Sequence, residues 1–389
     1  MNTLNSLGNE IRNIWHRGRL YTDLSTVTNV LRFRKIRRAY YRDLWKQTAD
    51  KIGAEYEEVS AFIRLSRNGL TTFVQDYLVM LDSHMTLEVM GNKALTLQLL
   101  NEVGAPTPDS CKFSLANLSP AEALIHKHGT VVVKPMSGTG GGRGVTTGVS
   151  NRDHLEKASK LAARSGPNLI AEAQLDVPCY RLLYLEGRLL DAVRRDPPVV
   201  IGDGITTIRN LIKLENFKRT GDTERTALSA LNIDRDAKNW LASIDRKLSD
   251  IPDSGERVQI KRAINENNAD QNFSVARNVS KQISQGCGKI STALSVSLAG
   301  IDLYCHDIEG DFTPDNCVIG EVNTTPGLHH HYLISNANHS RDVASTILDF
   351  MFRNQMGTLD LLAPKKRNKS SGHTAKDTLA GKESRACNV

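Results

Sequence analysis

The sequence predicts an α+β fold, with strands arranged as antiparallel hairpins and helices between them along the chain. The first indication is the stretch from Val131 to Val149, where two runs of β-branched residues flank a glycine-rich segment and so predict a hairpin. The second is a later pair of short apolar runs, 299–303 and 318–323, which predict another hairpin. Between them, apolar residues recur at helical spacing, as at 153–163.

Length and composition are those expected of a cytoplasmic globular protein with several domains. The chain has 389 residues and a mass of 43.0 kDa, which is enough for two or three domains with sizeable cores. It contains no run of eighteen apolar residues and no apolar signal-peptide core, so we expect neither a membrane span nor secretion. The six cysteines form no CxxC pair, so we expect reduced thiols rather than a zinc site or a disulfide framework.

The net charge of +7 raises the question of a nucleic-acid partner. The excess lies in two short clusters, 32–38 and 365–367, and no helix-turn-helix, RNA-binding or zinc motif accompanies either of them. Solvated basic faces are the better interpretation, so no nucleic-acid partner is expected. A basic protein also suits an anionic nucleotide substrate.

The first hundred residues predict an N-terminal arm and a small α/β lead domain. For the arm, residues 1–39, the sequence does not decide between a helix and a poorly ordered segment. In the lead domain, 40–108, helical spacing predicts a helix at 40–52, and strands are expected at 56–65 and 72–81. An Asn-Gly pair between the two strands predicts a hairpin turn.

The glycine-rich segment between the central strands predicts a phosphate-binding loop. Glycine lets backbone N–H groups approach phosphate oxygens without a Cβ in the way. A flexible hairpin tip would explain one or two glycines, but it explains five glycines in seven residues poorly. Neither of the two commonest phosphate-loop spacings, GxxxxGK[ST] and GxGxxG, is present. The candidate phosphate-binding residues are Lys134, Ser137, Gly138, Gly140, Gly141, Gly142 and Gly144.

Three oxygen-bearing side chains on the late strands could meet on one face as ligands of a cation. Glu321 and Asn323 lie two residues apart on one strand and so share a face, and a hairpin would bring Asp302 beside them. Edge strands with solvated polar residues are the alternative interpretation. The glycine loop earlier in the chain makes that alternative the weaker one.

Together these motifs resemble those of the ATP-grasp ligases. Lysine and proline at the end of a strand, followed by a glycine-rich hairpin tip, resemble the family's loop over the nucleotide phosphates, and the late strands resemble its metal strands. The stretch from Pro197 to Asn216, where Gly-Asp-Gly precedes a capped helix, closely resembles the ATP-grasp domain of cyanophycin synthetase and its peptide-ligase relatives. The Mur-ligase-like half of cyanophycin synthetase is missing, so we do not expect cyanophycin itself as the product.

The resemblance implies an ATP-grasp fold made of three parts. After the lead domain, a central subdomain at 109–175 would carry the glycine loop. A C-terminal subdomain at 176–355 would carry the metal strands and a helical insertion. Residues 356–389 are rich in Lys, Ser, Thr and Gly, and we expect them to be a disordered tail.

The resemblance also implies roles for single residues outside the loop. The implied nucleotide-binding residues, which hold a phosphate, the adenine edge or the ribose, are Lys93, Glu172, Gln174, Leu175 and Cys179. The implied catalytic residues are Arg181, Arg195 and Lys261. Two of these positions depart from the family pattern: Cys179 replaces a ribose-binding carboxylate, and Lys261 replaces an arginine.

The implied activity is ATP-dependent ligation of a carboxylate to an amine, with ADP as product and an acyl phosphate as intermediate. The expected cofactors are ATP and Mg²⁺ or Mn²⁺, and the expected partners are small-molecule amino acids or peptides. A small-molecule kinase on the same fold and a nucleotide-binding scaffold without turnover are the alternatives. The sequence leaves open whether the chain forms a homo-oligomer.

Three adjacent histidines, His329, His330 and His331, follow the metal strand. Along an extended chain their side chains would point in different directions, so we do not expect a single chelate. A structural role is preferred over substrate contact, and substrate contact over a transition-metal site.

Overall fold

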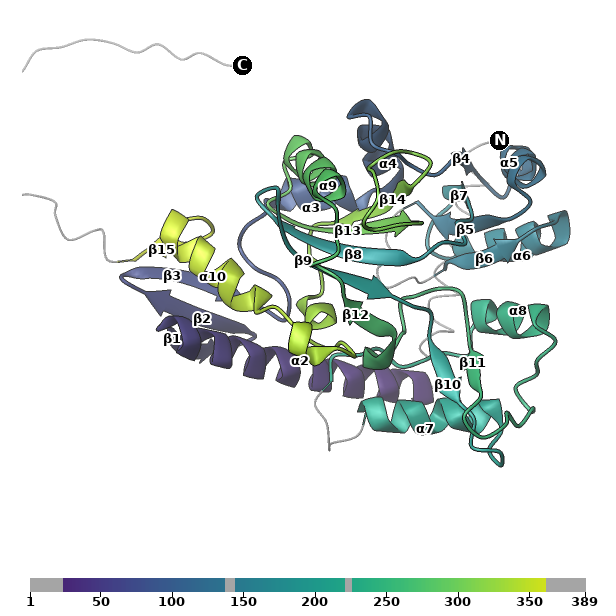
Figure 1. Cartoon of the computed structure of the whole chain (residues 1–389), viewed down its shortest axis with the longest axis horizontal. Coiled ribbons are helices and arrows are strands. Elements are labelled where there is room, and N and C mark those ends of the chain that lie inside the picture. The colour runs from purple at the N-terminus through teal and green to yellow at the C-terminus, as the bar shows by residue number, and fades with distance from the viewer. Residues whose placement is uncertain (1–23, 137–143, 221–225, 362–389) are drawn as a thin grey trace, which may run out of the picture.

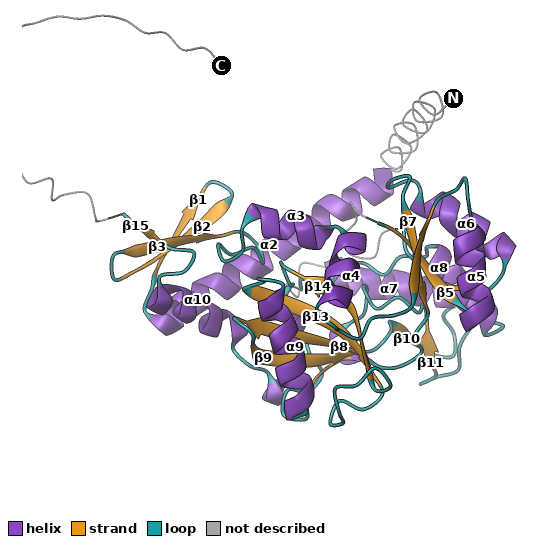
Figure 2. Ribbon diagram, turned by 90° about the horizontal axis from the view of Figure 1, so that it is seen from above, coloured by secondary structure: helices purple, strands orange, loops and turns teal. Residues whose placement is uncertain are grey.

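Antiparallel sheets form the framework of the molecule, and helices cover them (Figures 1 and 2). The computed structural model describes residues 24–136, 144–220 and 226–361. In these ranges the strand orders of the sheets are β1-β2-β3-β15, β4-β7-β5-β6, β12-β9-β8-β13-β14 and β10-β11. The predicted α+β fold is confirmed. No helix within the described ranges has the length and apolar character needed to cross a membrane.

The lead sheet packs against the first and the last described helices. Its elements are α2 (Leu24–Ile52), β1 (Glu55–Val59), β2 (Phe62–Arg67), β3 (Leu70–Val74), α10 (Val343–Asn354) and β15 (Leu359–Asp360). Tyr41 and Trp45 of α2 are fully buried in the core that the sheet shares with α10. The predicted hairpin turn is confirmed at Asn68 and Gly69, which have φ angles of 53° and 81°.

Three features of this region differ from the predicted elements. The stretch 56–65 is divided between β1 and β2, because the chain turns at Ser60 with a φ angle of 57°. Helix α2 begins at Leu24 and therefore runs through the predicted boundary at residue 40. Strand β15 pairs with β3, and Gly357 accepts a hydrogen bond from Thr72, so these residues belong to the lead sheet and not to a tail. Residues 362–389 of the predicted tail lie outside the described ranges.

The central sheet contains the predicted glycine hairpin. Its elements are β4 (Ser110–Phe113), α5 (Ser119–His128), β5 (Val131–Pro135), β6 (Thr146–Val149), α6 (Arg152–Ala162) and β7 (Leu169–Ala173). Strands β5 and β6 pair antiparallel with Val131 opposite Val149, which confirms the hairpin. Gly144 has a φ angle of 76°, and a Cβ at this position would lie 3.1 Å from Cγ of Pro135, so the position requires glycine. The loop residues Ser137, Gly138, Gly140, Gly141 and Gly142 lie outside the described ranges.

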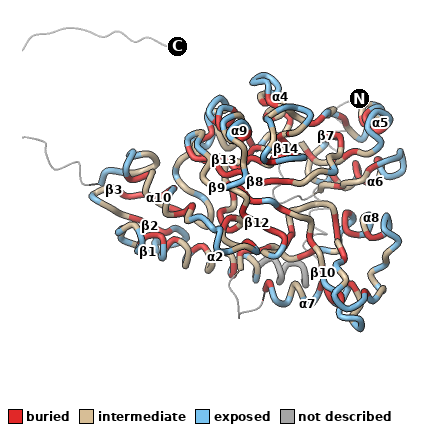
Figure 3. Tube along the Cα trace, in the orientation of Figure 1, coloured by how far each residue is buried: buried red, intermediate tan, exposed pale blue. Residues whose placement is uncertain are grey.

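The C-terminal sheet forms the centre of the molecule, and most of its length is buried (Figure 3). Its strands are β8 (Cys179–Leu185), β9 (Arg188–Arg195), β12 (Asn272–Ser274), β13 (Leu298–Cys305) and β14 (Cys317–Asn323). One face packs against apolar side chains of α3 (His84–Gly91), α4 (Lys93–Glu102) and α9 (Lys281–Ala293). The predicted hairpin of the late strands is confirmed, because β13 and β14 pair antiparallel with Asp302 opposite Glu321. Asp302 is also opposite Arg181 of β8, so these three side chains share the other face of the sheet.

A small unit is inserted between β9 and β12. It contains β10 (Val199–Ile201), α7 (Ile208–Thr220), α8 (Arg235–Ser243) and β11 (Arg257–Gln259), which enclose an apolar core of their own. The helix predicted from Ile208 is confirmed as α7, and the Thr207 hydroxyl accepts a hydrogen bond from the N–H of Asn210 at its start. Single 3₁₀ turns at Ala269–Gln271, Leu328–His331 and Ala337–His339 complete the described elements.

Candidate active site

Three cations, each held by a carboxylate, lie close together: one at the start of α4, one on the central sheet and one on the C-terminal sheet. Arg181 of β8 makes a two-point contact with Asp302, in which Nε and Nη2 lie 2.5 and 3.0 Å from the two carboxylate oxygens. Nζ of Lys134, near the end of β5, lies 2.6 Å from Oε2 of Glu172 on β7. Lys93, the first residue of α4, is paired with Glu321 of β14. We call these six residues the charge cluster.

The backbone explains how Lys93 reaches the cluster from a helix of the lead region. The N–H of Lys93 donates a hydrogen bond of 3.0 Å to the carbonyl of Met136, two residues beyond Lys134. The same helix start is capped by the Asn92 side chain, which accepts from the N–H of Leu95. Asn is among the residues preferred at this position, because its side-chain oxygen can accept a hydrogen bond from the first turn of the helix. The two lysines therefore converge from neighbouring segments.

The electrostatics show that the three pairs act as one cluster. Burial opposes ionisation of Glu321, but the charges of Lys93, Lys134 and Arg181 outweigh it and hold the pKa of this carboxylate at about 2. Burial likewise opposes the charge of Lys93, while the nearby carboxylates of Glu321, Glu172 and Asp302 raise its pKa. Every subdomain thus contributes charge to one place.

The charge on Glu321 makes the stability of the fold depend on pH in the acidic range. Because the pKa of Glu321 is lower in the folded protein than its usual value of 4.5, the ionised group stabilises the fold above about pH 4.5. That contribution is lost as the pH falls towards 2. The side chain is 38% exposed, so solvent screening keeps the effect modest. We expect the urea midpoint to fall between roughly pH 5 and pH 3, and to fall less in Glu321→Gln. Parallel curves for the two proteins would contradict this assignment.

The predicted metal ligands lie together on one face of the β13–β14 hairpin. Asn323 is opposite Gly300 and donates from Nδ2 to its carbonyl at 3.2 Å, so its amide oxygen is left for another partner. Carboxylate and amide oxygens are the donors that Mg²⁺ prefers, so Asp302, Glu321 and Asn323 fit such an ion by their chemistry. In the described part of the chain, no group of three or more His, Cys, Asp and Glu residues is arranged to hold a metal. The metal role of these residues stays a prediction.

Arg195 is a buried cation beside the cluster. Its side chain is 6% exposed, Nη2 donates to the carbonyl of Ile264 at 3.1 Å, and Nε has no hydrogen-bond partner. No ion pair joins it to a carboxylate among the described residues. Burial and the charge of Arg181 lower its pKa. A buried guanidinium of this kind favours an incoming anion.

The predicted ribose position is buried rather than open to a ligand. Cys179 is 4% exposed and lies opposite Arg195 on one side and Tyr304 on the other, and burial raises the pKa of its thiol to about 12. Nearby, Oε1 of Gln174 accepts the N–H of Gly148 at 2.6 Å, which ties the hinge to β6. Leu175 is half-buried in the linker between β7 and β8. The expected adenine and ribose contacts of these residues stay predictions.

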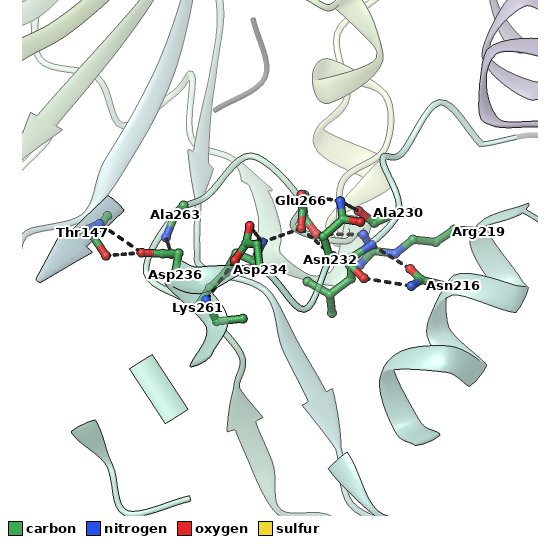
Figure 4. A network of polar contacts seen from close by, with 12 residues as sticks. Thr147, Asn216, Arg219, Ala230, Asn232, Asp234, Asp236, Lys261, Ala263 and Glu266 are labelled. Atoms are coloured by element: carbon green, nitrogen blue, oxygen red, sulfur yellow. Dashed lines mark hydrogen bonds and ion pairs between the residues drawn. The ribbon is translucent and has the colours of Figure 1, made fainter. Parts of the chain in front are cut away.

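Lys261 lies in a different polar network, that of the inserted unit (Figure 4). Its side chain is fully buried in the inserted unit, where Nζ donates to Asp234 at 2.8 Å and to Glu266 at 2.6 Å. Burial opposes the charge, but the two carboxylates raise the pKa of Lys261. This geometry supports a structural role, in contrast to the catalytic role implied by the resemblance.

Figure 4 also shows a contact that the sequence did not indicate. Asp236 of α8 accepts hydrogen bonds from the backbone N–H and the hydroxyl of Thr147 on β6, at 3.1 and 2.5 Å. Its other oxygen accepts the N–H of Ala263 at 3.0 Å. One buried carboxylate therefore ties the glycine hairpin to the inserted unit. The two partners are 89 residues apart, and no local pattern marks such a pair.

The three histidines lie on a 3₁₀ turn, and not on the extended chain that was expected. Nδ1 of His329 lies 2.8 Å from the Tyr41 hydroxyl of α2, and Nδ1 of His331 lies 2.8 Å from a carboxylate oxygen of Asp191 on β9. The His330 ring packs on His329, with centroids 4.0 Å apart. His329 and His331 therefore have different partners, on α2 and β9, and His330 stacks on His329. The contacts support the structural role.

Comparisons with known proteins agree with this architecture. No protein-family model matches the chain. Over 277 residues the chain is 26% identical to the glutathione biosynthesis bifunctional protein GshAB of Pasteurella multocida, covering 70% of this chain and 36% of that protein. Over 273 residues it is 26% identical to cyanophycin synthetase of Crocosphaera subtropica, covering 69% of this chain and 31% of that protein. The crystal structure of a bifunctional glutathione synthetase from Pasteurella multocida matches with a TM-score of 0.52 and 24% identity, over 79% of this chain and 43% of that chain.

These comparisons identify the fold. The chain has the ATP-grasp fold, as predicted from its motifs. Its sequence is similar to those of the glutathione biosynthesis bifunctional protein and cyanophycin synthetase, of which it spans less than half the length.

Proposed function

We propose that the chain is an ATP-dependent carboxylate–amine ligase that forms ADP. The charge cluster carries this proposal: Lys93, Lys134 and Arg181 converge from three segments, and each is neutralised by a carboxylate. Such an arrangement suits the exchange of one set of anions for another. When nucleotide phosphates bind, they would take the place of the Glu321 and Glu172 carboxylates as the negatively charged partners of the two lysines.

The exchange would also prepare the metal site. Once Lys93 turns to a phosphate oxygen, the Glu321 carboxylate becomes available beside Asp302 and Asn323, which together would hold Mg²⁺ or Mn²⁺. A bound divalent ion neutralises charge on the transferring phosphoryl group. Lys93 and Lys134 would orient the phosphates, and closure of the surrounding subdomains would exclude water from the reactive acyl phosphate.

The arginines would hold the second substrate. Arg195 is a buried cation without a carboxylate partner among the described residues, and Arg181 lies on the same sheet face. Their guanidinium groups suit a substrate carboxylate before phosphoryl transfer and the developing negative charge during attack by the amine. The relatives are named for glutathione biosynthesis and cyanophycin synthesis, so we propose an amino acid or peptide as the carboxylate substrate and an amine as the acceptor.

This function predicts a defined requirement for substrates. ADP release should reach its full rate only when a carboxylate and an amine are both present, and the ligated product should contain no phosphate. The test is ADP release over a matrix of amino acids and dipeptides, with mass spectrometry of the products. When the amine is withheld, hydroxylamine should trap the acyl phosphate as a hydroxamate.

Other outcomes would reject this function. Release of AMP and pyrophosphate would exclude transfer of the γ-phosphoryl group. A stable phosphorylated product that forms without an amine would identify a small-molecule kinase. Tight ATP binding without turnover on any substrate of the matrix would support a scaffold.

A further inference from the structure

Two buried cysteines face each other at one end of the metal hairpin. Cys305 is the last residue of β13 and Cys317 is the first residue of β14, and the strand register places them directly opposite. Both residues are fully buried, on the sheet face that packs against α9. Their sulfur atoms are 3.0 Å apart, about 1 Å more than the length of a disulfide bond.

The backbone geometry of this pair suits a covalent link. The N–H of Cys305 donates to Pro178 and that of Cys317 donates to Thr313, so the two cysteines exchange no backbone hydrogen bonds. The next pair along the strands does make a backbone hydrogen bond, from the N–H of His306 to the carbonyl of Asn316 at 3.0 Å. The cysteines therefore form a non-hydrogen-bonded antiparallel pair, in which the Cα atoms are about 4.5 Å apart. That separation lies within the range that disulfides require, so the strands need not move.

We propose that Cys305 and Cys317 are a redox-active pair that a peroxide converts to a cross-strand disulfide. The Cys305 thiol gives up its proton and its sulfur attacks hydrogen peroxide; an S–O bond forms, the O–O bond breaks and water leaves. The Cys317 sulfur then attacks this sulfenic acid; the S–S bond forms, the S–O bond breaks and a second water leaves. Two thiols are oxidised, and one peroxide is reduced to two waters.

The surroundings of the pair select Cys305 as the attacking group. The hydrogen bond from the Cys317 thiol lowers the pKa of Cys305, whereas the interaction with Cys305 raises that of Cys317. A thiolate is the reactive form of cysteine. Cys287 of α9 lies in the same core, but burial raises the pKa of its thiol to about 12, so it provides an internal control.

The sequence makes the test direct. No Lys or Arg lies between Lys289 and Arg341, so a single tryptic peptide, 290–341, contains Cys305 and Cys317 and no other cysteine. Reduced protein is treated with one equivalent of hydrogen peroxide, and the remaining thiols are alkylated before digestion. We expect this peptide to lose the mass of two hydrogen atoms and to take up no alkyl group. The peptide with Cys287 should be alkylated, and a thiol reductant should restore both sites.

Variants and stability provide independent readouts, none of which depends on the proposed ligase activity. In Cys317→Ser the reaction should stop at a sulfenic acid on Cys305, which a dione probe labels, whereas Cys287→Ser should still form the link. The oxidised wild-type protein should melt several degrees higher than the reduced protein, because the link closes a loop of about a dozen residues in the unfolded chain. Alkylation of both cysteines after peroxide treatment would overturn the proposal, and so would over-oxidation of Cys305 without a link.

Discussion

Replacement of Glu321 by glutamine is expected to lower turnover at saturating Mg²⁺-ATP about a thousandfold. Glutamine keeps the size of the side chain and one carbonyl oxygen, but it removes the charge that the proposed metal site needs. If this removes about 4 kcal/mol of stabilisation from the phosphoryl-transfer transition state, the rate falls by roughly that factor. The measurement is ADP release with the best substrate pair from the matrix, together with the affinity for ATP.

A matched control lies on the same hairpin. Glu309→Gln makes the same chemical change in the exposed loop between β13 and β14, where the carboxylate accepts a hydrogen bond from Asn278. We expect this variant to retain wild-type turnover. Glu309→Gln should melt at the wild-type temperature, and Glu321→Gln only slightly below it, because the second change removes the modest stabilisation by the ionised carboxylate but leaves the core packing intact. A Glu321→Gln protein with more than about a tenth of wild-type turnover would remove Glu321 from the metal site.

The second large effect concerns stability at Lys261. Replacement by methionine should lower the free energy of unfolding by about 3–5 kcal/mol, because it leaves Glu266 buried without its cation. The Glu266 side chain is only 9% exposed, and Asn232 still donates to both of its oxygens, which keeps the carboxylate in place. The thermal midpoint should fall by several degrees. The measurement is thermal or urea unfolding, with ADP release measured well below the midpoint.

Two further variants separate the structural from the catalytic role of Lys261. Lys238→Met makes the same change at an exposed position of α8 and should leave stability unchanged within about 0.5 kcal/mol. Lys261→Arg restores the residue expected from the family and should retain part of the lost stability through its charge. If Lys261→Met melts like the wild type but loses turnover, the catalytic assignment from the resemblance is correct and the structural one is wrong.

Local patterns in the sequence were sufficient for the hairpins and for half of the charge cluster. Lys134 before the glycine segment, and Asp302 and Glu321 on late strands, were recognised because alternation along a strand is a property of neighbouring residues. The role of Glu172 was assigned differently: the resemblance placed it at the adenine edge, and the structure pairs it with Lys134. No feature within a few residues of Glu172 indicates that pair.

The order of the residues is enough to predict which segments become strands, which of their side chains share a face, and that the chain has the ATP-grasp fold. The partner of each charged group, in contrast, depends on how distant segments pack together. Arg181 and Asp302 are 121 residues apart, and Lys93 and Glu321 are 228 apart, so their pairing depends on sheet register and on how the subdomains meet. The burial of Lys261 depends in the same way on two carboxylates that the inserted unit folds around it. Side-chain alternation is set within a few residues, whereas burial and ion pairing are set by segments that are distant in the chain.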